Sequence, residues 1–341
     1  MTAKTKGDAM KRALLAMLGT LVVVLAPMYA AHATAPGKDG SIAFRRYLDA
    51  AHRRGEIFTI NPNGAGVRRV THSHGNLGSE PDWSPNGRWI VYAVYPHGDE
   101  GRSRIFKIGP YGADRTKLAS TCTGKCVADG YPAWSPSGRR IAFQRGLRTG
   151  YKGRHNTAIF VMRSDGTHAR QVTKRGYFPP QATRFEDLAP AWAPDGKRLA
   201  FEKHDQKAAR HAIFTVRLDG TGLRRITPWR LDASQPDYAP NGRWILFRSN
   251  ANSDTAGNVW LVHPNGSRLH AVTHDPAGTA KWLSGSFSPT GRRITAARTR
   301  VANGMQQNAD VYVMHLDGSG LQDVTNSPNA WESAPDWGPK P

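Results

Sequence analysis

The sequence predicts an all-β protein, a six-bladed β-propeller with four antiparallel strands in each blade. Three observations support this fold class: a short aromatic motif that recurs along 341 residues, a second repeated signature between its copies, and chain ends that complement each other. One copy of the motif is Pro81-Asp82-Trp83-Ser84-Pro85-Asn86-Gly87-Arg88. The motif aromatics stand at 83, 134, 192, 238, 287 and 337, a spacing of 46 to 58 residues. A repeat of this length with strand-like segments between copies is typical of one propeller blade per repeat.

Each repeat predicts four strands in chain order. Strand A carries the motif aromatic, and strand B follows the glycine turn, as in Trp89-Ile90-Val91-Tyr92. Strand C is an Ile-Phe type segment that ends before an Asn-Gly or Asp-Gly turn, as at 57–60. Strand D is a short Val-Thr segment, as at 70–71. β-Branched and aromatic residues bounded by Asn-Gly or Asp-Gly are typical of hairpins, so the repeat predicts an antiparallel four-stranded blade.

The two ends of the chain predict how the ring closes. The first repeat begins at strand B, at 40–44, and lacks the aromatic strand. The missing strand A is supplied at the other end of the chain, by Pro335-Asp336-Trp337-Gly338-Pro339, and no strand B, C or D follows that segment in the sequence. Both ends are therefore expected to build one blade. Six aromatic strands and six C–D hairpins agree on six blades, spanning residues 40–341.

The N-terminal residues 1–33 have the pattern of a signal peptide. A basic start precedes an apolar stretch at 13–26, and Ala31-His32-Ala33 offers small residues at a cleavage position, with Thr34 as the expected mature start. Residues 34–39 then form a short segment before the propeller. The alternative is an uncleaved anchor, although the apolar stretch is short for a membrane span. We expect a secreted or periplasmic, cell-envelope protein with no transmembrane span after cleavage.

The two cysteines and the charge balance fit export. Cys122 and Cys126 are separated by three residues and are expected to form a small disulfide loop, with a redox or metal role as the alternative. Lys and Arg number 47 against 26 Asp and Glu, a net charge of +21. This basic protein should attract polyanions such as wall polymers or acidic glycans, unless the charge serves solubility alone. No specific nucleic-acid binding is expected, and the protein is expected to be a monomer.

Strand direction predicts which face carries recognition. The A–B and C–D turns share one face and are short and uniform, whereas the B–C and D–A loops share the other face and vary in length. Variable loops on a rigid scaffold usually carry function. The D–A loops should lie nearest the channel mouth, where they bring acidic and aromatic residues together. The candidate binding residues are Glu80, Asp129, Tyr131, Glu186, Asp187, Trp229, Asp232, Trp282, Trp331 and Glu332.

Such a mouth could hold a divalent cation such as Ca²⁺ or a basic peptide segment, and the alternative is a set of solvated loop charges. The motif aromatics are instead expected to pack between neighbouring blades. No Gly-x-Ser-x-Gly, His-Glu-x-x-His or phosphate-binding glycine loop is present, so no catalytic residue is assigned. A metal site drawn from the histidine pairs, or a carboxylate pair for glycoside cleavage, stays open. The histidine pairs are His72/His74, His204/His211 and His270/His274.

The motifs also carry a family resemblance. The unit Pro-x-Trp-Ser-Pro-x-Gly-Arg-x-Ile-x-Phe, followed by Ile-Phe-x-Met-x-x-Asp-Gly and a Val-Thr strand, resembles the PD40, or WD40-like, repeat of TolB-like propellers across residues 40–339. The resemblance implies an exported envelope protein whose propeller binds other proteins, including peptide segments at the channel mouth. TolB proteins also have a separate N-terminal α/β domain, for which only a handful of residues remain here after the expected cleavage. Related propellers occur in peptidases and in oligogalacturonide lyases with a metal-linked site.

Together these features predict an exported, non-enzymatic scaffold that binds a protein or peptide of the envelope through its variable-loop face. The alternative is a carbohydrate-active enzyme of the polysaccharide-lyase kind, or a protein that binds an acidic glycan or cell-wall polymer. A third reading is charge-driven adhesion to wall polymer, which should weaken steeply with salt.

Overall fold

The computed structural model describes residues 34, 36–98, 102–118, 126–148, 155–173, 185–249, 257–276, 279–302 and 305–341. These residues belong to one compact unit, Ala31–Pro341. The predicted signal peptide lies outside them. The described part is built of β-strands and two short 3₁₀ turns, η1 (Pro96–Gly98) and η3 (Trp229–Leu231). None of its helices has the length and apolar character needed to cross a membrane.

The described strands fall into six units of four, numbered here in chain order. Unit 1 contains β24 (Glu332–Pro339), β1 (Asp39–Tyr47), β2 (Gly55–Ile60) and β3 (Arg68–Arg69). Unit 2 contains β4 (Leu77–Trp83), β5 (Ile90–Tyr95), β6 (Arg104–Ile108) and β7 (Thr116–Lys117). Unit 3 contains β8 (Cys126–Trp134), β9 (Arg140–Arg148), β10 (His155–Arg163) and β11 (Arg170–Gln171). Unit 4 contains β12 (Phe185–Trp192), β13 (Arg198–Asp205), β14 (Arg210–Arg217) and β15 (Arg224–Arg225). Unit 5 contains β16 (Ala233–Tyr238), β17 (Ile245–Ser249), β18 (Asn258–Val262) and β19 (His270–Ala271). Unit 6 contains β20 (Ala280–Phe287), β21 (Arg293–Ala302), β22 (Met305–His315) and β23 (Gln322–Asp323).

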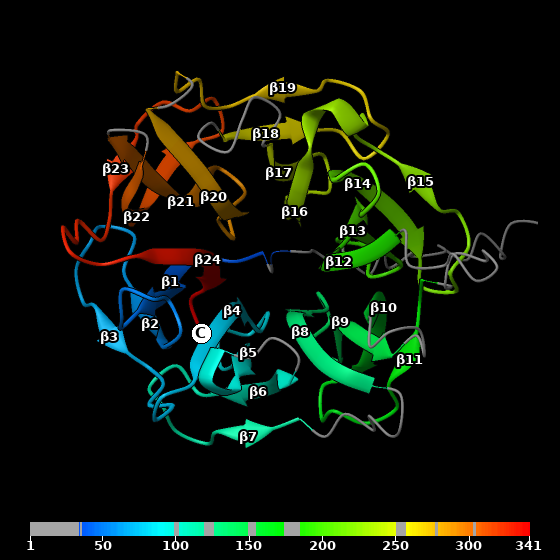
Figure 1. Ribbon diagram of the computed structural model, residues 1–341, viewed down its shortest axis with the longest axis horizontal. Helices are drawn as coiled ribbons and strands as arrows, with labels where there is room; N and C mark the ends of the chain where they lie inside the picture. The colour runs from blue at the N-terminus through cyan, green and yellow to red at the C-terminus, as the bar shows by residue number, and fades with distance from the viewer. Residues whose placement is uncertain are drawn as a thin grey trace, which may run out of the picture. The chain divides into compact units, whose positions relative to one another are not determined.

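Strand pairing within each unit is antiparallel and follows the predicted order A, B, C, D. Units 3 to 6 are separate four-stranded sheets. Units 1 and 2 are joined into an eight-stranded sheet by a single parallel contact between Gly55 and Leu77. The sheets are arranged around a common centre, with each strand A innermost and each short strand D at the periphery (Figure 1). The all-β propeller class is therefore confirmed.

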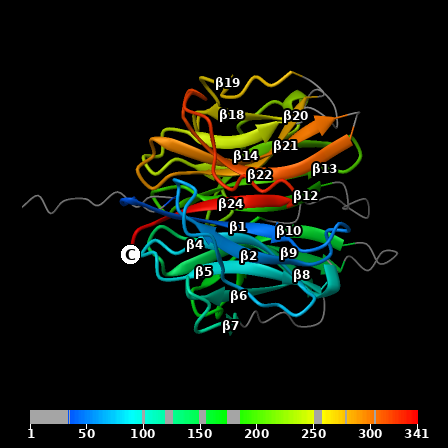
Figure 2. The same ribbon diagram turned by 90° about the vertical axis from the view of Figure 1, so that its left-hand side faces the viewer.

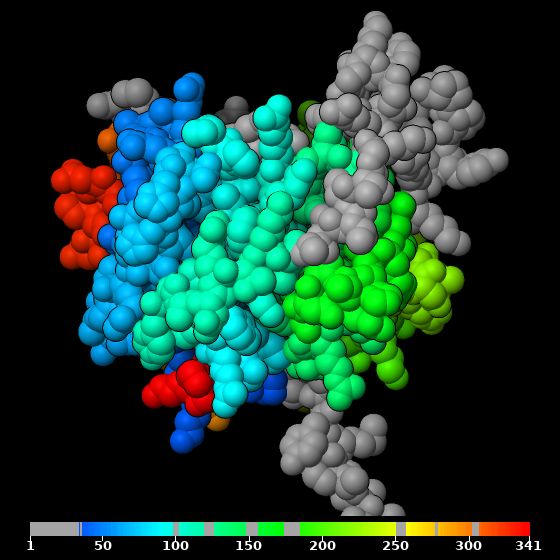
Figure 3. Space-filling model, turned by 90° about the horizontal axis from the view of Figure 1, so that it is seen from below, coloured from blue at the N-terminus to red at the C-terminus, as the bar shows by residue number. Residues whose placement is uncertain are grey.

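The C-terminal strand closes the ring, as predicted. β24 pairs antiparallel with β1, so Ile42 lies opposite Trp337 and Arg46 opposite Glu332. The described N-terminal segment and the C-terminus emerge on the same side of the sheets (Figure 2), and Lys340 N donates to Lys38 O over 2.9 Å. In the space-filling view the last residues, in red, lie against unit 2, in cyan (Figure 3).

The motif aromatics pack between neighbouring units, which confirms the expected role. Six apolar clusters among the described residues each combine side chains of two consecutive units. In the cluster between units 1 and 2, for example, Ile57 and Val70 pack against Trp83. Burying a side chain of this size stabilises the fold by roughly 1.5–3 kcal/mol. The aromatics at these junctions are Trp83, Trp134, Trp192, Tyr238, Phe287 and Trp337.

The Val-Thr signature has a structural cause. In unit 4 the buried Thr227 hydroxyl accepts a hydrogen bond from the backbone N–H of Ile213, over 2.9 Å. The same bond joins Thr71 to Ile57 and recurs in units 3, 5 and 6. The threonine satisfies a backbone donor within strand C. It thereby fixes the point from which each D–A loop leaves the sheet.

Candidate functional site

A polar cavity of about 630 Å³, called the funnel here, opens among the D–A and B–C loops. Its lining comes from the ends of strands B and the starts of strands A in units 1 to 5, so it lies on the loop face that the sequence predicts. A smaller central cavity of about 130 Å³ continues between the inner strands. The two cavities share four lining residues: Glu80, Tyr131, Ala189 and Gln235.

These four shared residues sit on β-bulges of the inner strands. Each precedes the proline of the repeat motif and has a positive φ, between 45° and 51°. The strand register shifts at the same points. A non-glycine residue at positive φ is strained by roughly 1–3 kcal/mol, and such strain persists only where surrounding structure enforces it. The bulges place these side chains in the walls of the two connected cavities.

One wall of the funnel is aromatic and cationic. The rings of Tyr47 and His52 stack with their centroids 4.3 Å apart, and Trp331 lies 4.7 Å beyond His52. The guanidinium of Arg45 sits over the Tyr47 ring at 4.4 Å. Tyr, Trp and Arg are the residues most enriched at binding hot spots. This wall therefore has the composition of a recognition surface.

The floor of the funnel carries Glu80. Its Oε2 accepts a hydrogen bond from the Tyr95 hydroxyl over 2.6 Å, and its Oε1 accepts one from Ser79 over 2.9 Å. Burial raises the pKa of Glu80, while the charge of Arg45 opposes that shift. Arg45 also hydrogen-bonds Ser79 and Ser333. The floor is thus a fixed hydrogen-bond network rather than a set of solvated loop charges.

Two acids of another funnel wall, Glu186 and Glu202, contact the histidine pair of the sequence. His204 and His211 stack at 4.2 Å, and His204 Nδ1 lies 3.2 Å from Glu186 Oε2. His211 Nδ1 lies 2.7 Å from Asp232 Oδ1, and its Nε2 is 3.4 Å from Glu202. Burial lowers the pKa of His211, but Asp232 and Glu202 outweigh it and the net shift is upward. A protonated His211 would carry positive charge beside these two acids.

Three predicted mouth acids are not free loop charges, which corrects the sequence-based expectation. Asp129, Asp187 and Glu332 lie in strand A of their units. Each is directly opposite a basic residue of the neighbouring strand B. Asp129 accepts two hydrogen bonds from Arg145, at 2.7 and 3.0 Å, and the two residues are 1% and 4% exposed. The inner strands begin earlier than the sequence suggests because they pair with long B strands. These acids stabilise sheets and do not line the funnel.

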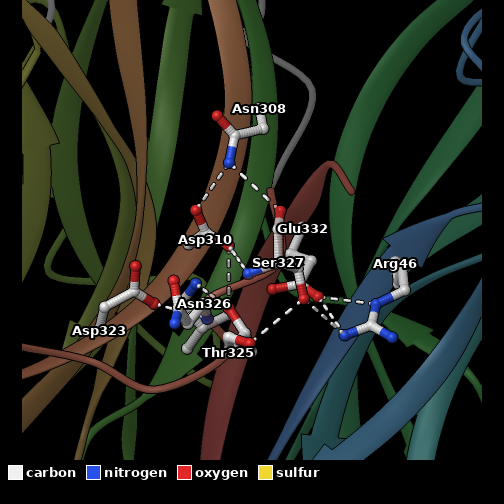
Figure 4. Close-up of polar contacts among 9 residues, drawn as sticks. Arg46, Asn308, Asp310, Asp323, Thr325, Asn326, Ser327 and Glu332 are labelled. Atoms are coloured by element: carbon white, nitrogen blue, oxygen red, sulfur yellow. Dashed lines mark hydrogen bonds and ion pairs between the residues drawn. The ribbon is translucent and has the colours of Figure 1, made fainter. Parts of the chain in front are cut away.

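Glu332 belongs to a polar network between units 6 and 1 (Figure 4). Its Oε1 accepts a hydrogen bond from Arg46 Nε over 2.7 Å. Nearby, Asp310 in β22 accepts the backbone N–H of Ser327 over 2.7 Å and the side-chain amide of Asn308 over 2.9 Å. Burial raises the pKa of Glu332, and its hydrogen bond from Thr325 and the Arg46 charge oppose this. The network anchors the loop that leads into the closing strand.

The other predicted residues divide between walls and core. Glu80, Tyr131 and Glu186 line the funnel, and Trp331 contacts the lining residue His52. Asp232 contacts His211, which does not line the funnel but lies beside the lining acid Glu202. Trp229 packs against Phe185 and Phe214, with centroids at 6.3 and 5.8 Å. Trp282 is 1% exposed in unit 6 and is a core residue rather than a mouth aromatic.

The metal and disulfide expectations fall partly outside the described residues. Cys126 is disulfide-bonded, and Cys122 lies outside the described part of the chain. Within that part, no three His, Cys, Asp or Glu side chains come together in a way that could hold a metal ion.

Several residues that line the funnel are not among those predicted from the sequence. The lining residues Arg45, Gln144, Glu202 and Arg248 occupy one repeated position, immediately after the strand-B aromatic. A second repeated position is the residue before the motif proline, which gives Ala189 and Gln235 as well as Glu80 and Tyr131. Alignment of these repeats contains this signal, because the two positions vary in chemistry while the phenylalanine before the first and the proline after the second are constant.

Comparisons with known proteins agree with this architecture. No protein-family model matches the chain. An uncharacterised protein of Agrobacterium fabrum is 24% identical over 302 residues, 80% of this chain and 87% of that protein. The Tol-Pal system protein TolB of Bordetella pertussis is 25% identical over 254 residues, 58% of this chain and 54% of its own length. The crystal structure of TolB from Acinetobacter baumannii matches with a TM-score of 0.66 at 19% identity, covering 88% of this chain and 67% of that one.

The chain has a β-propeller fold similar to that of TolB. It spans about half the length of the Bordetella TolB. The same fold also matches enzymes: an oligogalacturonate lyase of Vibrio parahaemolyticus aligns with a TM-score of 0.56 at 12% identity, over 86% of this chain and 77% of the lyase. At that identity the likeness concerns the fold alone, so TolB-like architecture by itself does not assign an activity.

Proposed function

We propose that this chain is an exported, non-enzymatic scaffold that binds a protein or peptide segment in the funnel of the loop face. The observation that carries the proposal is the funnel itself. It combines a stacked aromatic wall, an Arg45 guanidinium and fixed carboxylates, mounted on strained inner-strand positions of a closed ring. A cavity of about 630 Å³ is large enough for a few side chains of an inserted segment. The resemblance to TolB supports an envelope protein as the partner.

The partner is expected to insert an extended segment rather than dock flat. The funnel narrows to the central cavity, and both are lined by the bulge residues Glu80, Tyr131 and Gln235. Charges of both signs face the funnel, so the segment should itself carry acidic and basic groups. Affinity should come from the aromatic wall and specificity from the charges.

Affinity capture tests this function. The protein is immobilised, loaded with the envelope fraction of the producing cell, and washed at low and then high salt. One protein retained at high salt by the native chain and lost with Trp331→Ala supports the proposal, since a hot-spot residue contributes about tenfold or more in Kd. The matched control is Tyr111→Ala, because Tyr111 is 75% exposed on the opposite, turn face and should leave retention unchanged. If the Trp331→Ala variant retains the same protein as the native chain does, the funnel is not the binding site.

A second candidate is binding or cleavage of an acidic glycan. Arg45 and Arg248 both face the funnel, and the fold matches an oligogalacturonate lyase. Incubation with oligogalacturonides, with and without Mn²⁺ or Ca²⁺, tests it. Formation of unsaturated products, or glycan binding that persists at high salt, would favour this candidate over the scaffold. Glycan binding that salt abolishes would indicate charge-driven adhesion instead.

A further inference from the structure

The first described residue of the chain lies inside the propeller. Thr34 is 9% exposed and lines the central cavity. Its hydroxyl oxygen lies 3.4 Å from Asp237 Oδ2 and 3.4 Å from the carbonyl oxygen of Tyr238, more than 200 residues away in sequence. Thr34 is also the residue at which the sequence predicts the mature chain to begin. A residue beside the expected cleavage point is therefore seated against β16.

Three carboxylates surround the same cavity. Asp82, Asp237 and Asp336 come from the inner strands β4, β16 and β24. Each accepts one backbone N–H of the next unit, from Trp134 at 2.7 Å, Phe287 at 2.8 Å and Trp83 at 2.8 Å. None of the ion pairs between described residues includes these three acids. Burial raises the pKa of all three, to about 8 for Asp237 and about 6 for Asp336.

Two buried donors beside the same cavity are also without a hydrogen-bond partner among the described residues. They are the indole N–H groups of Trp83 and Trp134, and both tryptophans line this cavity. A buried unpaired donor costs roughly 1–3 kcal/mol. An occupant that supplies a cation to the carboxylates and oxygen acceptors to the indoles would suit both sets of groups. The amino-terminal end of a peptide chain has both kinds of group.

We propose that removal of the leader after Ala33 leaves Thr34 as the N-terminus and that its new α-ammonium group binds the carboxylates of the central cavity. The nitrogen belongs to a residue whose hydroxyl already contacts Asp237. An α-amino group has an ordinary pKa near 8 and is mainly protonated at neutral pH. The three carboxylates are half-buried, so the attraction between them and an ammonium group is stronger than between fully exposed charges.

Processing thereby becomes a structural step. In the precursor this nitrogen is a neutral peptide N–H, and the three acids have no cationic partner among the described residues. In the processed chain the ammonium donates up to three hydrogen bonds and joins inner strands from units 1, 2 and 5. Leader removal would then fasten the N-terminus across the ring centre and leave the funnel, on the opposite side, as the approach to the cavity.

Periodate oxidation tests the proposal. Periodate cleaves the vicinal amino alcohol of an N-terminal threonine to an aldehyde, which mass spectrometry and an aminooxy probe detect. The full chain is expressed with its own leader, and the exported protein is purified and its N-terminus identified by intact mass. The expected result is a chain that begins at Thr34 and whose oxidation is at least tenfold slower when folded than in guanidinium, equivalent to about 1.4 kcal/mol.

A matched pair of variants isolates the charge. Asp237→Asn keeps an oxygen acceptor for the Phe287 N–H but removes the carboxylate, so Thr34 should oxidise several-fold faster. Asp195→Asn, an exposed acid of the A–B turn in unit 4, should change nothing. Asp336→Asn serves as a second cavity variant if Asp237→Asn does not fold.

Three results would overturn the proposal. The first is a mature chain that begins elsewhere or retains its leader. The second is equal oxidation of Thr34 in the folded and unfolded protein. The third is a protected Thr34 whose rate is unchanged in a folded cavity variant, since burial alone, without the carboxylates, would then account for the protection.

Discussion

At the scale of single residues, acids next to the aromatic strand have two different fates. Asp129 lies across from Arg145 in the strand register, so it is buried in an ion pair. Glu80 lies on a bulge, so it lines the funnel. Both residues are acids a few positions before a motif aromatic. They differ in their place along the strand and in the local backbone φ. This is why the sequence predicts an acidic mouth but cannot say which acids belong to it.

The buried pair gives a stability prediction. Asp129→Ala leaves the Arg145 guanidinium buried without a counter-charge, and we expect the free energy of unfolding to fall by about 3–5 kcal/mol. Arg54→Ala is the matched control, because Arg54 forms a 2.9 Å pair with Asp49 at a side-chain exposure of 56% and should change stability by less than about 1 kcal/mol. Denaturant unfolding measures both. Equal losses in the two variants would contradict the assignment of the Asp129 pair to the core.

The cavity acids give a pH prediction for the chain with its leader attached. Burial raises the folded pKa of Asp237 from 3.8 to about 8, so the folded state binds more protons than the unfolded state. The resulting stabilisation is full below pH 4 and is lost as pH rises through about 8. The free energy of unfolding should therefore decrease across this range, and less steeply in Asp237→Asn. Identical slopes in the two proteins would show that Asp237 does not titrate as described.

At the scale of elements, the repeat predicts most strands because each carries its own local signal. The glycine turns, the Ile-Phe segments and the Val-Thr segments all recur, and each corresponds to a described strand or turn. The funnel is less predictable because its lining residues belong to no motif. Arg45, Gln144 and Glu202 share a strand position but not a residue type, so they become visible only when repeats are superimposed.

The Val-Thr element gives a prediction about loop anchoring. Thr227→Val keeps the shape of the side chain but leaves the Ile213 N–H unpaired, which should lower stability by about 1–3 kcal/mol. Hydrogen exchange should also increase in the adjoining turn, Trp229–Leu231. Thr221→Val, in an exposed C–D turn, should stay within about 0.5 kcal/mol of the native chain. A Thr227 variant as stable as this control would refute the anchoring role.

At the scale of the whole molecule, ring closure depends on the last strand. β24 provides Trp337, which is buried between units 6 and 1, and its indole N–H donates to Gly40 O over 3.0 Å. Removing residues 332–341 opens unit 1 and exposes the apolar cluster between units 6 and 1, so we expect loss of cooperative unfolding. Trp337→Ala should cost about 3–5 kcal/mol, measured by denaturant unfolding. A truncated chain that still unfolds in one cooperative transition would mean that the ring does not need this strand.

The proposed function requires that a partner enter the funnel on the loop face. The most direct measurement is photo-crosslinking with a photoreactive residue placed at His52, in the funnel wall, or at Tyr111, on the turn face. Each protein is incubated with the envelope fraction, irradiated and analysed by mass spectrometry. We expect one specific protein adduct from position 52 and none from position 111. An adduct from position 111 alone, or the same adducts from both positions, would contradict the proposed function.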